Sequence, residues 1–426
     1  MIHRFQILIW LSLLSLPWTG LGQTNSVDEL VAEALRDNPD LASAEADVAA
    51  ARGERRATGQ WKNPEISAEY GEKRVFDRST GELNGKGNAQ NYSIMQTFEF
   101  PGKASLRKAI ANQNIHLAEL ALEQMRLEVS AQARELTIQW VTAEQLADAE
   151  REVADRSETL VKMLGKRAPA GVQALLDQRI IEASLVSILT RTREAEEKRD
   201  GARFALNSLR GRKPNDPLRV TASMTPSPTK TEWAVLVERA KDSSLVLKSR
   251  NTEVEKAEKS LSQAKLGSAP DFSIGPFYSE ERAVDRERVL GVGVSMPLPI
   301  WDSNRGQTEA ARAGVAQAHA RKDQASRDLE RELAEHVNAY HLALKQLEKT
   351  PPEMLARLRD GAELADRQYR LGAVSVQTYL DMQQQYLEAT DGILGAVTEA
   401  HARLLKIQVI TADAALWSAP PQEKKP

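Results

Sequence analysis

The chain has 426 residues, of which 27% are charged and only 5% aromatic, and its formal net charge is −3. A nearly neutral chain gives no indication of nucleic-acid binding. The absence of cysteine excludes disulfides, thiolate metal sites and cysteine nucleophiles. Long stretches rich in Ala, Leu, Glu, Gln and Arg favour long helices and coiled coils.

The N-terminus predicts a signal peptide over residues 1–22. A basic start is followed by an apolar run over 5–18, and Gly20 and Gly22 suit a cleavage before Gln23. The alternative is a membrane anchor helix, for which the run is short. No other segment approaches the roughly 20 apolar residues of a spanning helix. If the exported chain crosses a membrane, we therefore expect it to do so with β-strands.

The sequence predicts a twofold internal repeat. Val31 and Val237 open similar helical runs, and Pro64 and Pro270 close them at the same offset. A period this long indicates a duplicated half rather than a short solenoid repeat. Each half is expected to run helix, two short strands, long helix, turn, long helix. The expected units are a first repeat over 23–210, a linker rich in proline over 211–230, a second repeat over 231–417 and a disordered tail over 418–426.

Two β-hairpins are predicted, at 64–100 and 271–298. In the first, apolar residues such as Ile66, Tyr70 and Tyr92 alternate with polar ones, which indicates strands. A polar loop is expected over 76–89, and a charged loop over 280–288 separates the second pair of strands. Pro276 weakens the third strand, because proline cannot donate to a ladder.

Each predicted strand is about the 9–11 residues that cross a bilayer at a tilt. One face is apolar, and the other is polar or glycine, as in outer-membrane strands. The alternation by itself is also compatible with two ordinary surface hairpins that pack on helices.

Two pairs of very long helices are predicted, over 104–209 and 304–416. The first helix of each pair approaches sixty residues. At that size its length would be about 90 Å, which is longer than the diameter of a compact globular domain. Thr350-Pro351-Pro352 should interrupt the second pair. Sustained seven-residue spacing indicates coiled-coil packing. The clearest such seam is Tyr379, Gln383, Tyr386, Thr390, Ile393, Val397, Ala400, Leu404, Ile407 and Thr411.

Four strands cannot close a useful barrel, and open sheet edges are not tolerated in lipid. The chain should therefore supply part of a shared barrel. The expected fold class is mainly α with a membrane β-hairpin pair. Three copies would give a 12-stranded β-barrel with four strands per chain, continued by a trimeric α-barrel tube of coiled-coil helices.

Over essentially the whole mature chain, this pattern resembles the TolC-like outer-membrane factors of tripartite efflux and secretion pumps. Residues 96–103, with the sequence QTFEFPGK, resemble the strand-to-helix junction of the heavy-metal efflux branch. Residues 369–375, with the sequence YRLGAVS, resemble the family's periplasmic tip turn.

The resemblance implies a homotrimeric exit duct in the outer membrane of a Gram-negative type bacterium, with its helical tube in the periplasm. It implies docking on a periplasmic adaptor (membrane fusion) protein and a drive from an inner-membrane pump, specifically a proton-driven RND transporter. The duct would export heavy-metal cations from the periplasm to the exterior. We expect no enzymatic activity, no cofactor and no resident metal.

The resemblance also suggests site residues. Carboxylates that follow the second tip turn ring the closed aperture in the family, and Asp381 matches one such position, with Thr378 at the other. Asp177 is the repeat counterpart, and an Asp ring attracts cations. The alternative is that both Asp residues simply favour the dipole in the first turn of their helices. The expected adaptor contacts at the two tips are Gly372, Ala373, Val374 and Ser375, with Ala170, Gly171 and Val172.

Two other functions remain open at this point. The first is an exit duct for drug efflux or protein secretion. The second is a periplasmic coiled-coil adaptor or scaffold protein. A duct would have a duplicated hairpin and helix pair, which an adaptor lacks.

Overall fold

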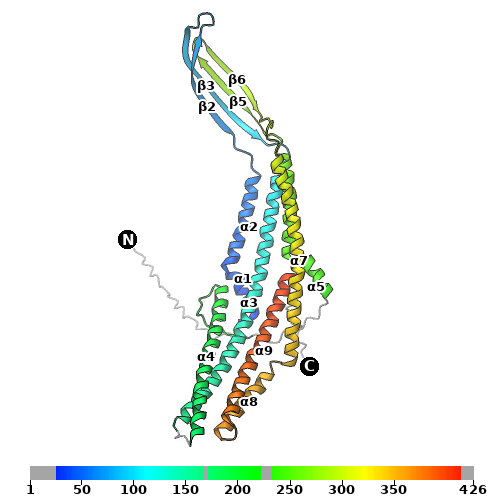
Figure 1. The fold of residues 1–426 in the computed structure, drawn as a ribbon. Coiled ribbons are helices and arrows are strands. Elements are labelled where there is room, and N and C mark those ends of the chain that lie inside the picture. Colours follow the sequence, from blue (N-terminus) through cyan, green and yellow to red (C-terminus); the bar gives the residue numbers. More distant parts are fainter. Residues whose placement is uncertain (1–24, 167–170, 222–232, 414–426) are drawn as a thin grey trace, which may run out of the picture.

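The computed structural model describes residues 25–166, 171–221 and 233–413. The predicted signal peptide, the tip residue Ala170, part of the linker and the tail 418–426 lie outside these residues. Figure 1 shows an elongated molecule with a β-sheet at one end and long helices running away from it to the opposite end.

The N-terminal helical run is divided in two, where a single helix was expected. Helix α1 spans Val27–Asp37, and α2 spans Pro39–Thr58. The side chain of Asn38 accepts hydrogen bonds from the backbone N–H of Asp40 at 2.8 Å and of Leu41 at 3.3 Å. Asparagine as N-cap and proline at the first helical position both favour a new helix start.

The four-stranded sheet is antiparallel, in the order β2-β3-β5-β6. Strand β2 spans Glu65–Phe76, β3 Leu83–Phe98, β5 Phe272–Arg282 and β6 Arg286–Ser295. Strands from the two halves of the chain meet at the centre, where Tyr92 pairs with Tyr278. Strands β2 and β6 are the outer strands.

The strands extend further than the sequence indicated. The loop expected over 76–89 narrows to 77–82, and residues 280–288 are mainly paired strand rather than a loop. Glu280 lies opposite Arg288 and Arg282 opposite Arg286. Ladder bonds join backbone groups, so polar side chains do not prevent them. Strand β5 also continues through Pro276, which lies opposite Val292.

Two helix pairs lead away from the sheet. Helix α3 spans Lys103–Leu164 and α4 Val172–Leu209. In the other half, α5 (Trp233–Ser243) and α6 (Leu245–Leu266) precede the strands, and α7 (Arg305–Lys349), α8 (Met354–Arg370) and α9 (Val376–Thr411) follow them. The 62 residues of α3 correspond to about 90 Å. Helix α7 ends at the predicted proline break.

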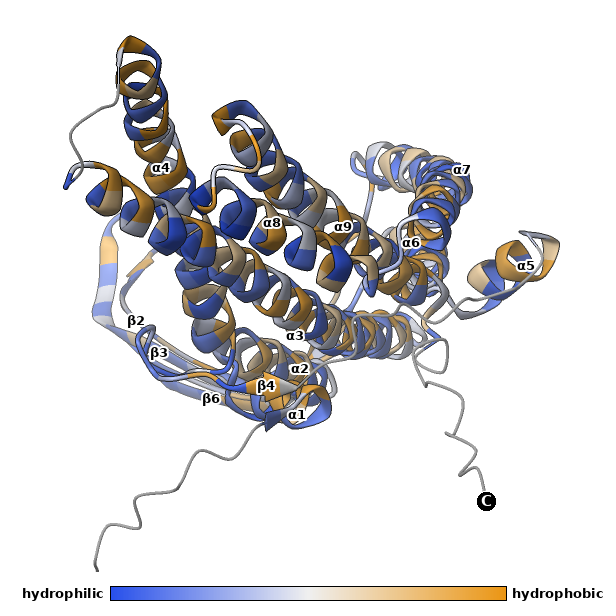
Figure 2. Cartoon of the chain, turned by 90° about the horizontal axis from the view of Figure 1, so that it is seen from below, coloured by the Kyte–Doolittle hydropathy of each residue, from blue (hydrophilic) through white to orange (hydrophobic). Residues whose placement is uncertain are grey.

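The helices pack along apolar seams rather than around one globular core. All ten seam positions predicted in α9 are buried. Leu333 and Tyr340 of α7 pack with Val397 and Leu404 of α9 in the largest cluster, which Ile138 of α3 joins. Seen along the long axis, each helix carries both hydrophobic and hydrophilic residues (Figure 2). Helices α7 and α3 pack on α9 in the largest cluster, and Ala362 of α8 packs with Leu387 of α9 in another, so neighbours cover more than one side of α9.

A short parallel pairing was not predicted. Strand β1 (Asn25–Ser26) pairs with β4 (Val220–Thr221), which brings the middle of the linker to the beginning of α1. Within the described residues, no helix has an apolar stretch long enough to cross a membrane.

Candidate functional site

The turn between α8 and α9 is a well-defined helix stop. The N–H of Ala373 donates to the C=O of Gln368, and the N–H of Gly372 to the C=O of Tyr369, both at 2.9 Å. This pair of bonds is a Schellman motif. Gly372 has φ +75°, the left-handed conformation that glycine adopts without strain. The predicted tip turn is therefore rigidly shaped by its backbone.

Ser375 begins the next helix. Its Oγ accepts from the backbone N–H of Thr378 at 3.1 Å and also lies 3.0 Å from Thr378 Oγ1. Both residues are exposed. Thr378, a predicted gate residue, therefore takes part in the cap of α9.

Aromatic packing joins the two tips. The rings of Tyr369 and Tyr379 are stacked with centroids 5.3 Å apart. Tyr379 is fully buried and packs with Leu160 of α3 and Ile181 of α4. Its hydroxyl lies 3.3 Å from Ser157 Oγ of α3. Burial raises the pKa of the Tyr379 phenol. This cluster holds the end of one helix pair against the other.

An ion pair that sequence reasoning missed supports the second tip. Arg370 donates from Nε and Nη2 to the two carboxylate oxygens of Asp366, at 2.9 and 3.2 Å. Asp366 is buried, in the last turn before the predicted tip. The spacing of four residues on one helix face was the available signal.

Asp177 and Asp381 occupy matching local settings. Each accepts a hydrogen bond from the glutamine four residues earlier, Gln173 at 2.9 Å and Gln377 at 2.7 Å. Asp381 is exposed and Asp177 half-buried. Burial raises the pKa of the Tyr369 phenol, and the nearby negative charge of Asp177 adds to the rise. Asp177 therefore lies beside the end of α8.

The described residues contain no group of three acidic or histidine side chains placed to hold a metal ion. Asp177 and Asp381 each accept a hydrogen bond from a glutamine of their own helix, so neither carboxylate belongs to such a group. A ring of carboxylates at the tip would need several copies of the chain.

The first tip differs from the second. Gly171 has φ +109°, and α4 starts without a side-chain cap. Val172 is 75% exposed, and Leu175 and Leu176 after it are also exposed. Leu371 at the second tip is 78% exposed. Sequence reasoning missed these three leucines, although an apolar residue off the seam beside a glycine turn was a usable signal.

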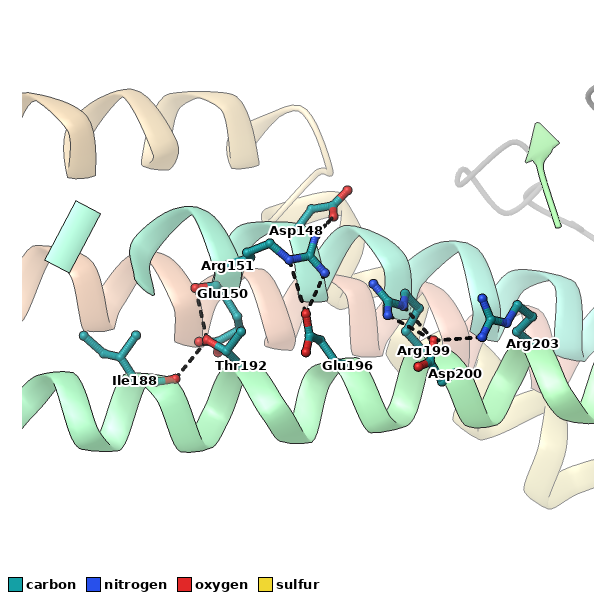
Figure 3. Close-up of polar contacts among 9 residues, drawn as sticks. All are labelled: Asp148, Glu150, Arg151, Ile188, Thr192, Glu196, Arg199, Asp200 and Arg203. Carbon is teal, nitrogen blue, oxygen red and sulfur yellow. Dashed lines mark hydrogen bonds and ion pairs between the residues drawn. The ribbon is translucent and has the colours of Figure 1, made fainter. Parts of the chain in front are cut away.

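Polar contacts join α3 to α4 behind the first tip (Figure 3). Arg151 of α3 bonds Glu196 of α4 at 2.8 Å and Asp148 of its own helix at 2.9 Å. Thr192 of α4 donates to the backbone oxygen of Glu150 at 3.3 Å.

The Glu150 side chain is the most deeply buried part of this contact. Only 3% of the residue is exposed, and Oε1 accepts from Arg191 Nε of α4 at 3.1 Å. Its Oε2 atom has no hydrogen-bond partner among the described residues. Burial raises the pKa of the Glu150 carboxyl, and the Arg191 charge opposes part of that rise.

Comparisons with known proteins show which family has a similar sequence. The family described as "Outer membrane efflux protein" matches residues 30–212 and 236–412. The cobalt-zinc-cadmium resistance protein CzcC of Cupriavidus metallidurans is 22% identical over 306 residues, covering 71% of this chain and 72% of that protein. The nickel-cobalt-cadmium resistance protein NccC of Alcaligenes xylosoxydans xylosoxydans is 25% identical over 310 residues, covering 69% of this chain and 65% of that protein.

A solved structure shares the fold. The Campylobacter jejuni CmeC outer membrane channel superposes with a TM-score of 0.74 at 16% identity, over 96% of this chain and 93% of that chain. The similarity extends over the sheet and the long helices together.

Proposed function

This chain belongs to the outer membrane efflux protein family, and we propose that it forms the trimeric exit duct of a tripartite efflux system. The chain is an efflux channel protein of the outer membrane, and its family is one of transporters rather than enzymes. We assign it no catalytic residue. The match over both halves argues against the periplasmic adaptor alternative.

One observation carries the proposal: a small sheet with an exposed apolar face stands at the end of long helices, of which α3 alone spans about 90 Å. Side chains on this face include Ile66, 80% exposed, and Leu290, 81% exposed. Strands β2 and β6 end the sheet on either side. Lipid requires every backbone group to be paired, so these edges call for neighbouring copies. Three copies supply a 12-stranded barrel and a tube of helices beneath it, each chain contributing both of its duplicated halves.

We propose heavy-metal cations as the cargo. CzcC and NccC are named for cobalt, zinc, cadmium and nickel resistance. The face of the sheet opposite the apolar one, which would line the duct, carries four acidic residues against one lysine. They are Glu65, Glu69, Glu281 and Glu287, with Lys73. An acidic lining favours cations.

We further propose that the tips dock on a periplasmic adaptor protein, itself coupled to a proton-driven RND pump of the inner membrane. The docking surface comprises Gly372, Ala373, Val374 and Ser375 at one tip and Ala170, Gly171 and Val172 at the other. The exposed Leu371, Leu175 and Leu176 support it, since clustered exposed apolar side chains mark interaction sites.

Asp381, Asp177 and Thr378 form the proposed gate. Both carboxylates sit one turn inside their helices at the tip end, so three copies would place six of them around the aperture. The exposure of Asp381 supports access to passing ions.

Planar-bilayer recording of the purified full-length protein tests the duct. We expect discrete cation-selective conductance, and Asp381→Asn with Asp177→Asn should reduce the preference for cations over anions. Matched control substitutions Glu258→Gln and Glu309→Gln, outside the tip, should leave selectivity unchanged. A protein that never conducts would contradict the proposal.

Deletion of the gene tests the cargo. Lower tolerance to cobalt, zinc, cadmium or nickel supports metal efflux. Unchanged metal tolerance with increased sensitivity to drugs, or with loss of a secreted protein, would instead favour the alternative duct functions.

A further inference from the structure

The exposed apolar face of the sheet ends in a dense group of basic side chains. Residues directly opposite each other in an antiparallel pair project on the same face. By the register, Ile274 and Val294 share a face with Tyr278 and Leu290, and the next rows outward on that face are charged. Glu280 pairs there with Arg288, and Arg282 with Arg286. The sequence predicts a loop over these residues, whereas the structure pairs them as strands.

Three guanidinium groups converge on one carboxylate at this place. Arg286 Nε donates to Glu280 Oε1 at 2.7 Å, and Arg288 Nε lies 3.5 Å from Oε2. Arg282 Nε bonds the same Oε1. Tyr278, the last residue of the apolar row, donates its hydroxyl to Glu280 Oε2 at 2.6 Å. The group is therefore anchored directly to the apolar face.

The Glu280 carboxylate occupies only some of the hydrogen-bond donors of the three arginines. Each guanidinium has five N–H donors, and the contacts to Glu280 are made through Nε. The Glu280 side chain is 11% exposed, whereas all three arginine side chains are about half exposed. One negative charge faces three positive ones, so the group can take a further anion.

The other hairpin repeats the arrangement on the same face. Glu72 bonds Arg74 at 2.9 Å and Lys86 at 2.9 Å, and Arg74 lies directly opposite Lys86. Among the strand residues of this face beyond the apolar rows, five basic side chains stand against two acidic ones. The opposite face has an excess of acid. The positive charge is thus confined to the face that also exposes the apolar rows.

The height of the group matches the edge of a lipid layer. From Phe272 to Glu280 is eight residues, or about 27 Å along the strand. A tilt of about 40° reduces this to roughly 20 Å, comparable to the apolar band of outer-membrane strands. The helices leave from the other end of the sheet (Figure 1), so this end is directed outward.

We propose that Arg282, Arg286 and Arg288 bind the phosphate of an outer-leaflet lipid headgroup, with Arg74 and Lys86 as the second half of the same belt. This inference rests on the proposed function, because it takes the apolar face to be in contact with lipid. Planar guanidinium groups match phosphate oxygens in geometry and charge. A lipid is favoured over a soluble anion because its acyl chains would lie on the adjoining apolar rows.

The test measures binding of diphosphoryl lipid A to the purified full-length protein in detergent, by native mass spectrometry. We expect R282Q/R286Q/R288Q to weaken binding by about tenfold or more. The matched control R312Q/R321Q/R327Q removes the same charge from the exposed surface of α7 and should bind as the wild type does. A lysine version of the first triple variant should keep part of the affinity.

Two further arms identify the ligand. Dephosphorylated lipid A should bind the wild-type protein markedly less well, and millimolar inorganic phosphate should not displace the lipid. Equal binding of the dephosphorylated lipid, displacement by free phosphate, or equal losses in both triple variants would overturn the proposal. The two wild-type arms decide it even if the glutamine variant fails to fold.

Conductance of the same preparations separates this inference from the proposed function. A wild-type protein that conducts but shows no preference for phosphorylated lipid refutes the lipid site alone. A protein that does not conduct at all refutes the duct.

Discussion

At the scale of single residues, Gly372 shows how one backbone angle defines the tip. A Cβ added there would meet nothing within 4 Å, so space does not explain the glycine. Its φ of +75° does, because an L side chain in that region is strained. The turn type could be predicted from the local sequence, since helix ends commonly place glycine at this position.

Gly372→Ala should therefore destabilise the tip by about 1 kcal/mol through conformation alone. Gly372→Asn should cost less, because asparagine tolerates the left-handed region. Thermal unfolding of the purified protein measures both. As a control, Gly392→Ala lies within α9 with open space around it and should be neutral or stabilising. Equal effects of Ala and Asn at 372 would contradict the conformational explanation.

Glu150 is a buried carboxylate with one oxygen that lacks a hydrogen-bond partner among the described residues. Burial raises its pKa in the folded protein. A carboxyl whose pKa is higher in the folded than in the unfolded protein lowers the stability of the fold as the pH rises. The loss begins at the pKa of the unfolded state, about 4.3, and continues through the pKa of the folded state. Below that window the carboxyl is protonated in both states, so it costs nothing.

Glu150→Gln should accordingly raise the unfolding temperature relative to the wild type at pH 7.5, and this gain should shrink at pH 4. Arg191→Gln should do the reverse and destabilise more at pH 7.5, because it leaves a buried carboxylate unpaired. Thermal melts at the two pH values measure each difference. A gain for Glu150→Gln that is independent of pH would show that ionisation is not the cause.

At the scale of elements, α9 connects the two helix pairs. Its seam includes Gln383, which is polar but buried, and the structure explains it: Nε2 donates to the backbone C=O of Ala362 in α8 at 2.8 Å. The seam could be predicted from its spacing. The bond to Ala362 could not, because it depends on how α8 folds back after the proline break.

Tyr379 is the point where α9 meets α3, α4 and α8, so its removal should separate the tips. Tyr379→Ala should destabilise by about 3–5 kcal/mol, as expected for a large buried aromatic. Tyr379→Phe should cost under about 1.5 kcal/mol, since it removes only the long contact to Ser157. Thermal unfolding and limited proteolysis of the tips measure the effect. Comparable losses in both variants would place the importance in the hydroxyl instead.

At the scale of the whole molecule, the sheet is incomplete within one chain. Strand β2 lies at one edge and β6 at the other. An assembled barrel would bring β2 of one copy beside β6 of the next. Because the chain has no cysteine, introduced thiols report this contact without background.

Ser67→Cys on β2 combined with Ser295→Cys on β6 should give disulfide-linked dimers and trimers on non-reducing gels. Either single variant should remain a monomer under the same oxidation. Since disulfides need Cα atoms within about 7 Å, pairs shifted by two residues, such as Ser67 with Gly293, test other registers. Absence of linked species at every register would contradict barrel closure.

Features that depend on neighbours along the chain could be predicted from the sequence. Alternation marked the apolar faces of the strands, seven-residue spacing marked the buried seam of α9, and prolines marked where α7 ends. These features follow from backbone geometry and local chemistry, which a short window contains.

The contacts between groups far apart in the sequence depend on the folded arrangement of the whole chain. The fold extended β5 and β6 through residues 280–288, because backbone pairing does not depend on side-chain polarity. It stacked Tyr369 on Tyr379 and brought Arg191 to Glu150. Contacts between helices or strands far apart in sequence are selected by packing of the whole chain, so local pattern carries no signal for them. For the same reason, Asp381 and Asp177 could be named as candidates from the sequence, whereas the position of Asp177 beside Tyr369 of α8 emerged only from the fold.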